Sequence, residues 1–367
     1  MNLRPSGWNA PIILVLGLVL GCGAGVARAD FAAGVAAYKR GDFSAALERF
    51  EPLAAAGDAR AQFALGLLHD NGEGVARDDD RAAHWYRLAA EQGYAKAQYN
   101  LALMIEHGRS GPGGQAREWF ARAALRGNAD AVARLHGFAE QGDVAAQLQL
   151  GRMYYLGRGV ARSPRDAFGW FAEAAGAGDH DAAFALGVLY DTGDGVAEAP
   201  AEAARWYAQA AAAGHHEAQY NLARLHRLGR GVTRDVAVAR DFYEAAATAG
   251  LVKAELTLAM LFEAGAGWPH DAALARHWYE QAALHGSAPA QVNLAYLYAE
   301  GVGTDVDLLE ACALLAVAAE QGFAVARENR ELLCTGLDAA ALAAVDARAS
   351  RYRQDQPTPL AALDSND

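Results

Sequence analysis

Histidine and cysteine are the residue types in this chain best suited to binding a metal ion or attacking a substrate. The sequence holds 11 histidines and 3 cysteines. No histidines form the His-Glu-x-x-His pair of zinc hydrolases, and no cysteines and histidines have the spacing of a zinc site. His84 and His277 each precede a Trp-Tyr pair, so a repeated unit of sequence explains their placement better than metal binding does. The sequence therefore predicts no metal site.

Glycine-rich loops and serines could suggest nucleotide binding or nucleophilic catalysis. Gly72-Glu73-Gly74 and Gly157-Arg158-Gly159 resemble the start of a dinucleotide-binding loop, but no strand precedes them and no third glycine opens a helix. Tight turns between helices explain both loops. Ser163 and Ser287 lack the sequence context of a nucleophilic serine. We therefore predict no catalytic residue and no cofactor, and expect that the protein is not an enzyme.

A repeat surrounds these motifs and must position whatever the protein binds. The segment Ala203–Gly214 has the order alanine, aromatic pair, alanine pair, glycine, and close copies of it recur along the chain. A fixed period of this size indicates stacked helical units, and abundant alanine favours helix. We predict an all-α solenoid of helix-turn-helix repeats. The closing glycines recur every 36 residues, at Gly142, Gly178, Gly214, Gly250, Gly286 and Gly322.

An aromatic residue stands one helical turn before the alanine pair of each copy, so both face the same side of a helix. The rings could stack on sugars, but their equal placement in every repeat favours core packing. The glycine is expected to end each helix in the left-handed conformation. The predicted aromatic stripe consists of Trp85, Trp119, Trp170, Trp206, Tyr243 and Trp278.

The repeats divide the chain into segments. A hairpin cap is expected at 30–57, repeats one and two at 58–127, a partial repeat at 128–142 and five repeats at 143–322. A helical cap at 323–352 and a disordered, proline-containing tail at 353–367 complete the prediction. The partial repeat breaks the phase, so we expect a bend or an exposed groove there.

Residues 1–29 have the pattern of a signal peptide. Arg4 precedes an apolar run from Pro11 to Leu20, and Ala27-Arg28-Ala29 forms a cleavage site before Asp30. The sequence Val19-Leu20-Gly21-Cys22 also resembles a lipoprotein signal, in which Cys22 would be acylated. Both alternatives predict export, either to the periplasm or to an envelope membrane with Cys22 as the only anchor.

Apart from Cys22, the cysteines of the chain are Cys312 and Cys334. Export would allow a disulfide between them. The alternative is a pair of buried, inert cysteines that pack as small apolar residues. The net charge of −12 and the lack of clustered positive charge predict that nucleic acid is not a partner.

Polar positions on the first helix of each repeat form the candidate binding surface. When positions are numbered within the repeat, these polar residues lie about one helical turn apart, on the face of the helix opposite the apolar positions. Amide, arginine and tyrosine side chains suit recognition of peptide backbones and carboxylates, and the alternative is an ordinary solvated face. The candidate groove residues are Asn100, Arg152, Tyr155, Asp191, Asn221, Arg224, Arg227, Asn293 and Tyr296.

The repeated elements Ala-x-x-x-Leu-Gly, Gly-x-Gly-Val, Ala-x-x-Trp-Tyr and Ala-Ala-x-x-Gly resemble those of the SEL-1-like repeat family, a relative of the tetratricopeptide repeats. The resemblance covers about residues 31–333. It implies a right-handed α-solenoid that holds other proteins together, in quality control, envelope assembly, secretion or host contact. A cysteine-rich branch linked to penicillin binding carries a cysteine pair in every repeat, which this chain does not.

We therefore expect an exported, non-enzymatic scaffold that binds protein or peptide partners in the bacterial cell envelope. One alternative is a lipid-anchored assembly factor for exopolysaccharide or cell-wall machinery. A second alternative, from another functional class, is an envelope hydrolase or a penicillin-recognising repeat protein.

Overall fold

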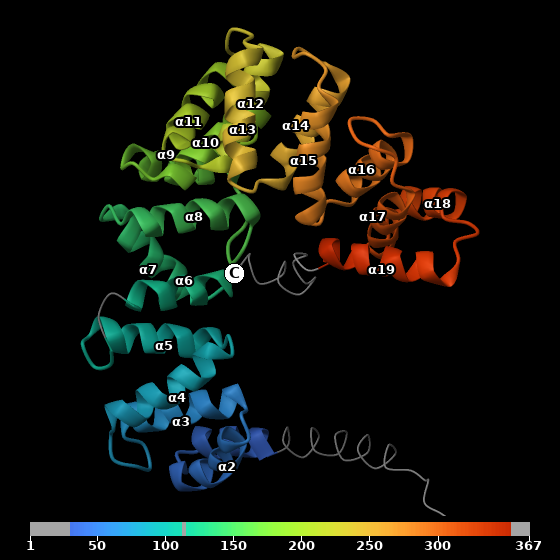
Figure 1. The fold of residues 1–367 in the computed structure, drawn as a ribbon. Coiled ribbons are helices and arrows are strands. Elements are labelled where there is room, and N and C mark those ends of the chain that lie inside the picture. The colour runs from blue at the N-terminus through green and yellow to red at the C-terminus, as the bar shows by residue number, and fades with distance from the viewer. Residues whose placement is uncertain (1–29, 112–114, 354–367) are drawn as a thin grey trace, which may run out of the picture. The chain divides into compact units, whose positions relative to one another are not determined.

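A computed structural model of the protein describes residues 30–111 and 115–353 (Figure 1). Within these ranges the regular secondary structure is helical and no strand occurs. The chain divides into two compact halves, one ending at Ala174 and the other beginning at Ala175. The predicted signal segment, with Cys22, lies outside the described residues, and so does the predicted tail from residue 354 onward.

The helices of the N-terminal half follow a helical stretch at 30–39. They are α2 (Phe43–Ala55), α3 (Ala59–Asn71), α4 (Asp79–Glu91), α5 (Ala95–Glu106), α6 (Ala116–Leu125), α7 (Ala129–Glu140), α8 (Val144–Leu156) and α9 (Pro164–Gly176), whose last turn holds the boundary.

The C-terminal half contains α10 (His180–Thr192), α11 (Pro200–Ala212), α12 (His216–Leu228), α13 (Val236–Thr248), α14 (Val252–Ala264), α15 (Ala272–Leu284), α16 (Ala288–Glu300), α17 (Leu308–Glu320), α18 (Ala324–Leu333) and α19 (Ala339–Arg353).

Within each half, consecutive helices pack against one another. In the N-terminal half α3 packs on α4 and α5 on α6, and in the C-terminal half α10 packs on α11, α12 on α13, α14 on α15 and α16 on α17. We call the first helix of each such pair helix A and the second helix B. The predicted all-α fold of helix-turn-helix repeats is confirmed. No helix in the described part of the chain has the length and apolar character needed to cross a membrane.

In each helix B that carries an aromatic pair, one ring is completely enclosed. It belongs to the second residue of each aromatic pair, because neighbouring helix positions point about 100° apart and only one of them can face the core. The predicted stripe is therefore correct at Tyr243 but wrong in detail elsewhere, since the tryptophans before the buried rings are only half-buried at the core edge. The buried rings are those of Tyr86, Phe120, Phe171, Tyr207, Tyr243 and Tyr279.

The buried rings need small residues on the preceding helix A. A Cβ atom added to Gly187 of α10 would lie 2.5 Å from Cδ1 of Tyr207, and one added to Gly66 of α3 would lie equally close to Tyr86. Non-bonded carbon atoms do not approach this closely, so the tyrosine ring occupies the space that any larger side chain in place of the glycine would need. Glycine on helix A and the ring on helix B are thus one packing unit.

In five of the repeats a glutamine side chain joins the repeat to the helix before it. The glutamine is the fifth residue of the repeat and lies in helix A. Its side-chain amide donates to a backbone carbonyl near the end of the preceding helix, where the carbonyl has no hydrogen-bond donor within its own helix. These bonds join Gln62 to Ala54, Gln98 to Ala90, Gln147 to Ala139, Gln219 to Ala211 and Gln291 to Ala283, at 3.0–3.4 Å.

A second glutamine extends this connection where helix B ends. Gln92 donates to the Oε1 atom of Gln62 at 2.8 Å, and Gln321 donates to Oε1 of Gln291 at 3.1 Å. Each helix B then ends at its closing glycine, and Gly214 shows the expected left-handed backbone with φ of 87°. The same polar contacts thus recur near both ends of the described chain.

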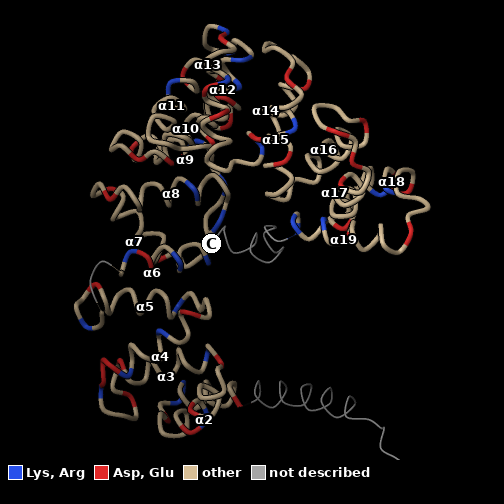
Figure 2. The backbone as a smooth tube through the Cα atoms, viewed as in Figure 1, with Lys and Arg blue, Asp and Glu red and all other residues tan. Residues whose placement is uncertain are grey.

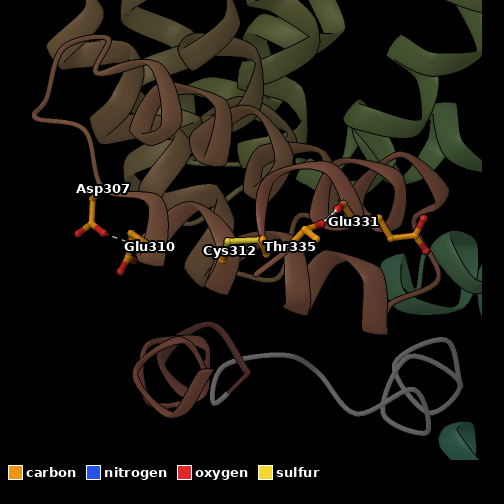
Figure 3. Close-up of a disulfide and its surroundings, with 6 residues drawn as sticks. Asp307, Glu310, Cys312, Glu331 and Thr335 are labelled. Atoms are coloured by element: carbon orange, nitrogen blue, oxygen red, sulfur yellow. Dashed lines mark hydrogen bonds between the residues drawn. A yellow bond between two sulfur atoms is a disulfide. The ribbon is translucent and has the colours of Figure 1, made fainter. Parts of the chain in front are cut away.

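A disulfide joins Cys312 of α17 to Cys334, the residue after α18 (Figure 3). Of the two alternatives for these cysteines, the structure has the bonded one. Cys312 is buried among the apolar residues of α17. The bond therefore fixes the end of α18, which carries 1 buried residue of its own, Ala326, to a well-packed helix.

We predict that Tyr207→Ala destabilises the C-terminal half by about 3–5 kcal/mol, because it removes a fully buried ring. Trp206→Ala in the same helix should cost about 1–2 kcal/mol, since the Trp206 ring is half-buried. Urea unfolding followed by circular dichroism measures both. Equal costs for the two variants would contradict the assignment of the core ring.

Gly187→Ala should destabilise the protein by about 1–3 kcal/mol, because the new methyl group displaces the Tyr207 ring. The matched control is Gly169→Ala in α9, where an added Cβ meets no atom within 4 Å. That control should stabilise by about 0.5–1 kcal/mol through helix propensity. A stabilising effect at Gly187 would show that the close approach is not required.

Reduction of the disulfide should lower the stability of the C-terminal end by about 3 kcal/mol, as expected for a bond that closes a loop with a sequence separation of 22. Thermal unfolding with and without dithiothreitol measures the effect. The Cys312→Ala, Cys334→Ala double variant is the control, because its unfolding should not respond to the reductant.

Candidate functional site

All nine candidate groove residues lie on first helices of repeats. In the N-terminal half Asn100 lies on α5 and Arg152 and Tyr155 lie on α8. The C-terminal half contains the other six, which are Asp191 on α10, Asn221, Arg224 and Arg227 on α12, and Asn293 and Tyr296 on α16. They occupy the seventh, tenth and thirteenth places of their repeats, so each half has one face on which these residues recur.

The N-terminal half shows what the amide at the seventh place does. The hydroxyl of buried Tyr86 donates to Oδ2 of Asp70 at 3.3 Å, and Nδ2 of Asn100 donates to the same hydroxyl at 3.1 Å. Arg109 pairs with Asp70 and also with Asp79, at 2.5 Å from the latter. Burial raises the pKa of Tyr86. Asn100, Asp70 and Arg109 therefore form a cluster of polar side chains around the hydroxyl of the core tyrosine, which we call a polar clamp.

The same clamp recurs at Tyr207 in the C-terminal half. Its acid is Asp191, which is 5% exposed and pairs with Arg224 and with Arg230, the latter at 2.8 Å. Burial raises the pKa of Tyr207, the nearby carboxylate of Asp191 adds to this, and a hydrogen bond from Asn221 opposes it. A buried carboxylate is stable only when paired, so the arginines are structural partners of Asp191.

The third clamp surrounds Tyr279. Its hydroxyl donates to Oε2 of Glu263 on α14 at 2.5 Å, and Nδ2 of Asn293 donates to the hydroxyl at 3.2 Å. Burial and the bond to Glu263 raise the pKa of Tyr279. The three candidate asparagines thus have one common role, which is to hold the phenol of the preceding helix B.

The remaining candidates differ in exposure. Arg227 is half-buried and hydrogen bonds to Tyr243, which opposes the rise in the pKa of Tyr243 caused by burial. Tyr155 is half-buried, with the guanidinium of Arg162 5.8 Å from its ring centre. Arg152 is exposed, and Tyr296 is 56% exposed. A role of these residues in partner binding stays a prediction.

Sequence reasoning missed four members of the clamps, which are Asp70, Arg109, Arg230 and Glu263. A signal for two of them was present, because Asp70 and Glu263 occupy the same thirteenth place as Asp191. The arginines come from loops after the next helix A, and their contact with an acid one repeat earlier is visible only in three dimensions.

The C-terminal half has a pocket of about 350 Å³ where α16, α17 and α18 meet. Its lining includes Asn293 and Tyr296 from α16 and Leu332 from α18, together with Glu263. Leu332 is 83% exposed. Two of the predicted groove residues therefore line a pocket to which α18, outside the regular repeats, contributes one wall.

Two further pockets lie within the N-terminal half. One of about 200 Å³ is lined by aromatic residues of the first helices, including Phe31, Phe63 and Tyr94. The other, of about 540 Å³, is lined by His136 of α7, Tyr154 of α8 and Trp170 of α9. It lies beside the single helix α7, where the break in the repeat suggested a groove.

Figure 2 shows positive and negative residues interspersed along the helices of each half. Among the residues that the structure describes, no group of three or more His, Cys, Asp or Glu side chains could hold a metal ion.

Comparison with known proteins gives partial matches to curated relatives. The chain is 30% identical over 159 residues to an exopolysaccharide production negative regulator of Rhizobium leguminosarum bv. viciae, which covers 39% of this chain and 54% of that protein. It is 31% identical over 132 residues to chitin synthase regulatory factor 3 of Schizosaccharomyces pombe, covering 35% of this chain and 13% of that protein. The chain thus spans about half or less of the length of these relatives.

The fold and the family are matched over much more of the chain. A Sel1 repeat protein from Oxalobacter formigenes superposes with a TM-score of 0.52 at 29% identity, over 91% of this chain and 98% of that one. The Sel1 repeat model matches residues 59–94, 95–128, 144–179, 180–215, 216–251, 252–287 and 288–323. These seven matches cover more than half of the sequence and show that the chain belongs to the Sel1 repeat family.

Proposed function

We propose that the protein is an exported scaffold that binds protein partners in the bacterial cell envelope. Sel1 repeat proteins mediate protein–protein interactions and are typically non-catalytic. The observation that carries the proposal is the pocket of the C-terminal half, which Tyr296 and Leu332 line with exposed side chains. Exposed apolar side chains around a pocket are typical of interaction sites.

Two observations support export. The sequence of residues 1–29 has the parts of a signal peptide. The Cys312–Cys334 disulfide is of the kind that forms and persists in oxidising compartments such as the periplasm. Acylation at Cys22 would place the same scaffold on a membrane surface, and cleavage before Asp30 would release it.

A narrower proposal concerns the pathway. The curated relatives include a negative regulator of exopolysaccharide production and a regulatory factor of chitin synthase. Both names concern the control of polysaccharide synthesis. We propose as a second candidate function that this protein is a scaffold for exopolysaccharide or cell-wall machinery.

Capture of crosslinked partners tests the scaffold function. The full-length protein with a C-terminal tag is expressed in a Gram-negative host, fractionated and crosslinked in isolated envelopes, and its N-terminal peptide is identified by mass spectrometry. We expect a mature start at Asp30 or an acylated Cys22, and a prey that the Tyr296→Ala, Leu332→Ala double variant captures at least fivefold less. Fivefold corresponds to about 1 kcal/mol, a modest loss for two interface side chains.

The matched control is Leu342→Ala on α19, which removes an apolar side chain that is 47% exposed and lies outside the pocket. It should capture the prey as well as the unchanged protein does. An uncleaved protein in the cytoplasm would contradict export. Undiminished capture of the prey by the double variant would contradict the assignment of the pocket as the binding surface. Arg224 is unsuitable for this test because its loss would leave buried Asp191 short of a partner.

A further inference from the structure

The three tyrosine clamps differ in how the acid is neutralised. Asp70 pairs with Arg109, and Asp191 pairs with Arg224 and Arg230. Glu263 accepts the hydroxyl of Tyr279, but within the described residues it forms no ion pair. The third clamp therefore has an acid and a phenol but lacks the cation that the other two contain.

The repeat register explains the missing cation. The residues two repeats after Arg224 and Arg230 are Tyr296 and Val302, so both cationic positions hold uncharged side chains beside Glu263. Arg227, at the thirteenth place one repeat before Glu263, is hydrogen bonded to Tyr243. Glu263 and Tyr296, which correspond in the repeat to Asp191 and Arg224, both line the pocket.

The pocket has the chemistry of an arginine site. Glu263 supplies a carboxylate at its wall, Asn329 supplies an amide, and Tyr296 supplies an exposed aromatic ring. A guanidinium group pairs with a carboxylate through parallel hydrogen bonds and stacks on aromatic faces, whereas an ammonium group acts as a point charge. Leu332 and Leu333 add apolar surface beside these groups.

We propose that the pocket binds an arginine side chain of a partner polypeptide, which supplies in trans the cation that Arg230 supplies in cis beside Asp191. The guanidinium pairs with Glu263 and stacks on Tyr296, and an apolar neighbour in the partner packs on Leu332. This inference rests on the proposed scaffold function and specifies the partner as a basic and apolar segment. The net charge of −12 favours the approach of such a segment.

Fluorescence anisotropy with labelled peptides tests the proposal. The probes are acetylated Gly-Ser peptides of about ten residues whose central pair is Leu-Arg, Leu-Lys or Leu-Gln. The purified protein should bind the Leu-Arg peptide about tenfold tighter than the Leu-Gln peptide, the factor expected for one charge-assisted contact. The Leu-Lys peptide should bind more weakly than the Leu-Arg peptide. Equal binding of all three, or no binding, would overturn the proposal.

Two variants change the site in defined ways. Glu263→Gln should abolish the preference for arginine, while its amide oxygen can still accept the Tyr279 hydroxyl. Tyr296→Arg places an arginine of the chain itself where Arg224 stands two repeats earlier, so it should also lower the affinity for the Leu-Arg peptide about tenfold or more. Unchanged binding by either variant, with unfolding temperatures like that of the unchanged protein, contradicts the assignment.

Asp241→Asn on α13 is the matched control, because it removes one exposed negative charge of the same half outside the pocket. It should bind the Leu-Arg peptide like the unchanged protein, and a tenfold loss would show that overall charge, not Glu263, selects arginine. Crosslinked capture with Glu263→Gln separates the two proposals. A prey retained at full yield contradicts the arginine site and leaves the scaffold function standing, whereas no prey with the unchanged protein contradicts the scaffold function itself.

Discussion

The packing of an aromatic ring against a small residue of the preceding helix, found in every repeat but the last, is the contact on which the fold depends. The ring of Tyr207 occupies the space above Gly187, and its hydroxyl group reaches the polar edge where Asp191 lies. One side chain thus fills the core and organises the polar face. Because a tyrosine cannot be enclosed without a partner for its hydroxyl, the polar clamp follows from the choice of core residue.

The fold could be predicted because each repeat contains the same short sequence pattern. The glycine at the end of helix B and the alanine pair one turn earlier specify a helix end and a close-packed face in every copy. The prediction that Trp206 enters the core was wrong, and Tyr207 is the buried ring. Adjacent positions look equally apolar in the sequence until the neighbouring helices fix the phase of the helix.

The candidate site was only partly accessible to the same reasoning. The period predicted that Asn221, Arg224 and Asn293 share one kind of helix face, but it could not show that they bond to a tyrosine and an acid of neighbouring helices. These partners are up to 33 residues apart. The pocket was not visible at all, because α18 forms one wall and its sequence lies beyond the regular repeats.

The glutamine contacts between repeats have a consequence for the evolution of the chain. Gln92 meets Gln62 in the same way that Gln321 meets Gln291, so the surfaces on which successive repeats stack share much of their polar chemistry. A duplicated repeat inserted between two others would find matching partners on both sides. Length is therefore free to change by duplication, while a difference at one place of the polar face, such as Tyr296 where an earlier repeat carries Arg224, changes the side chains that one copy presents.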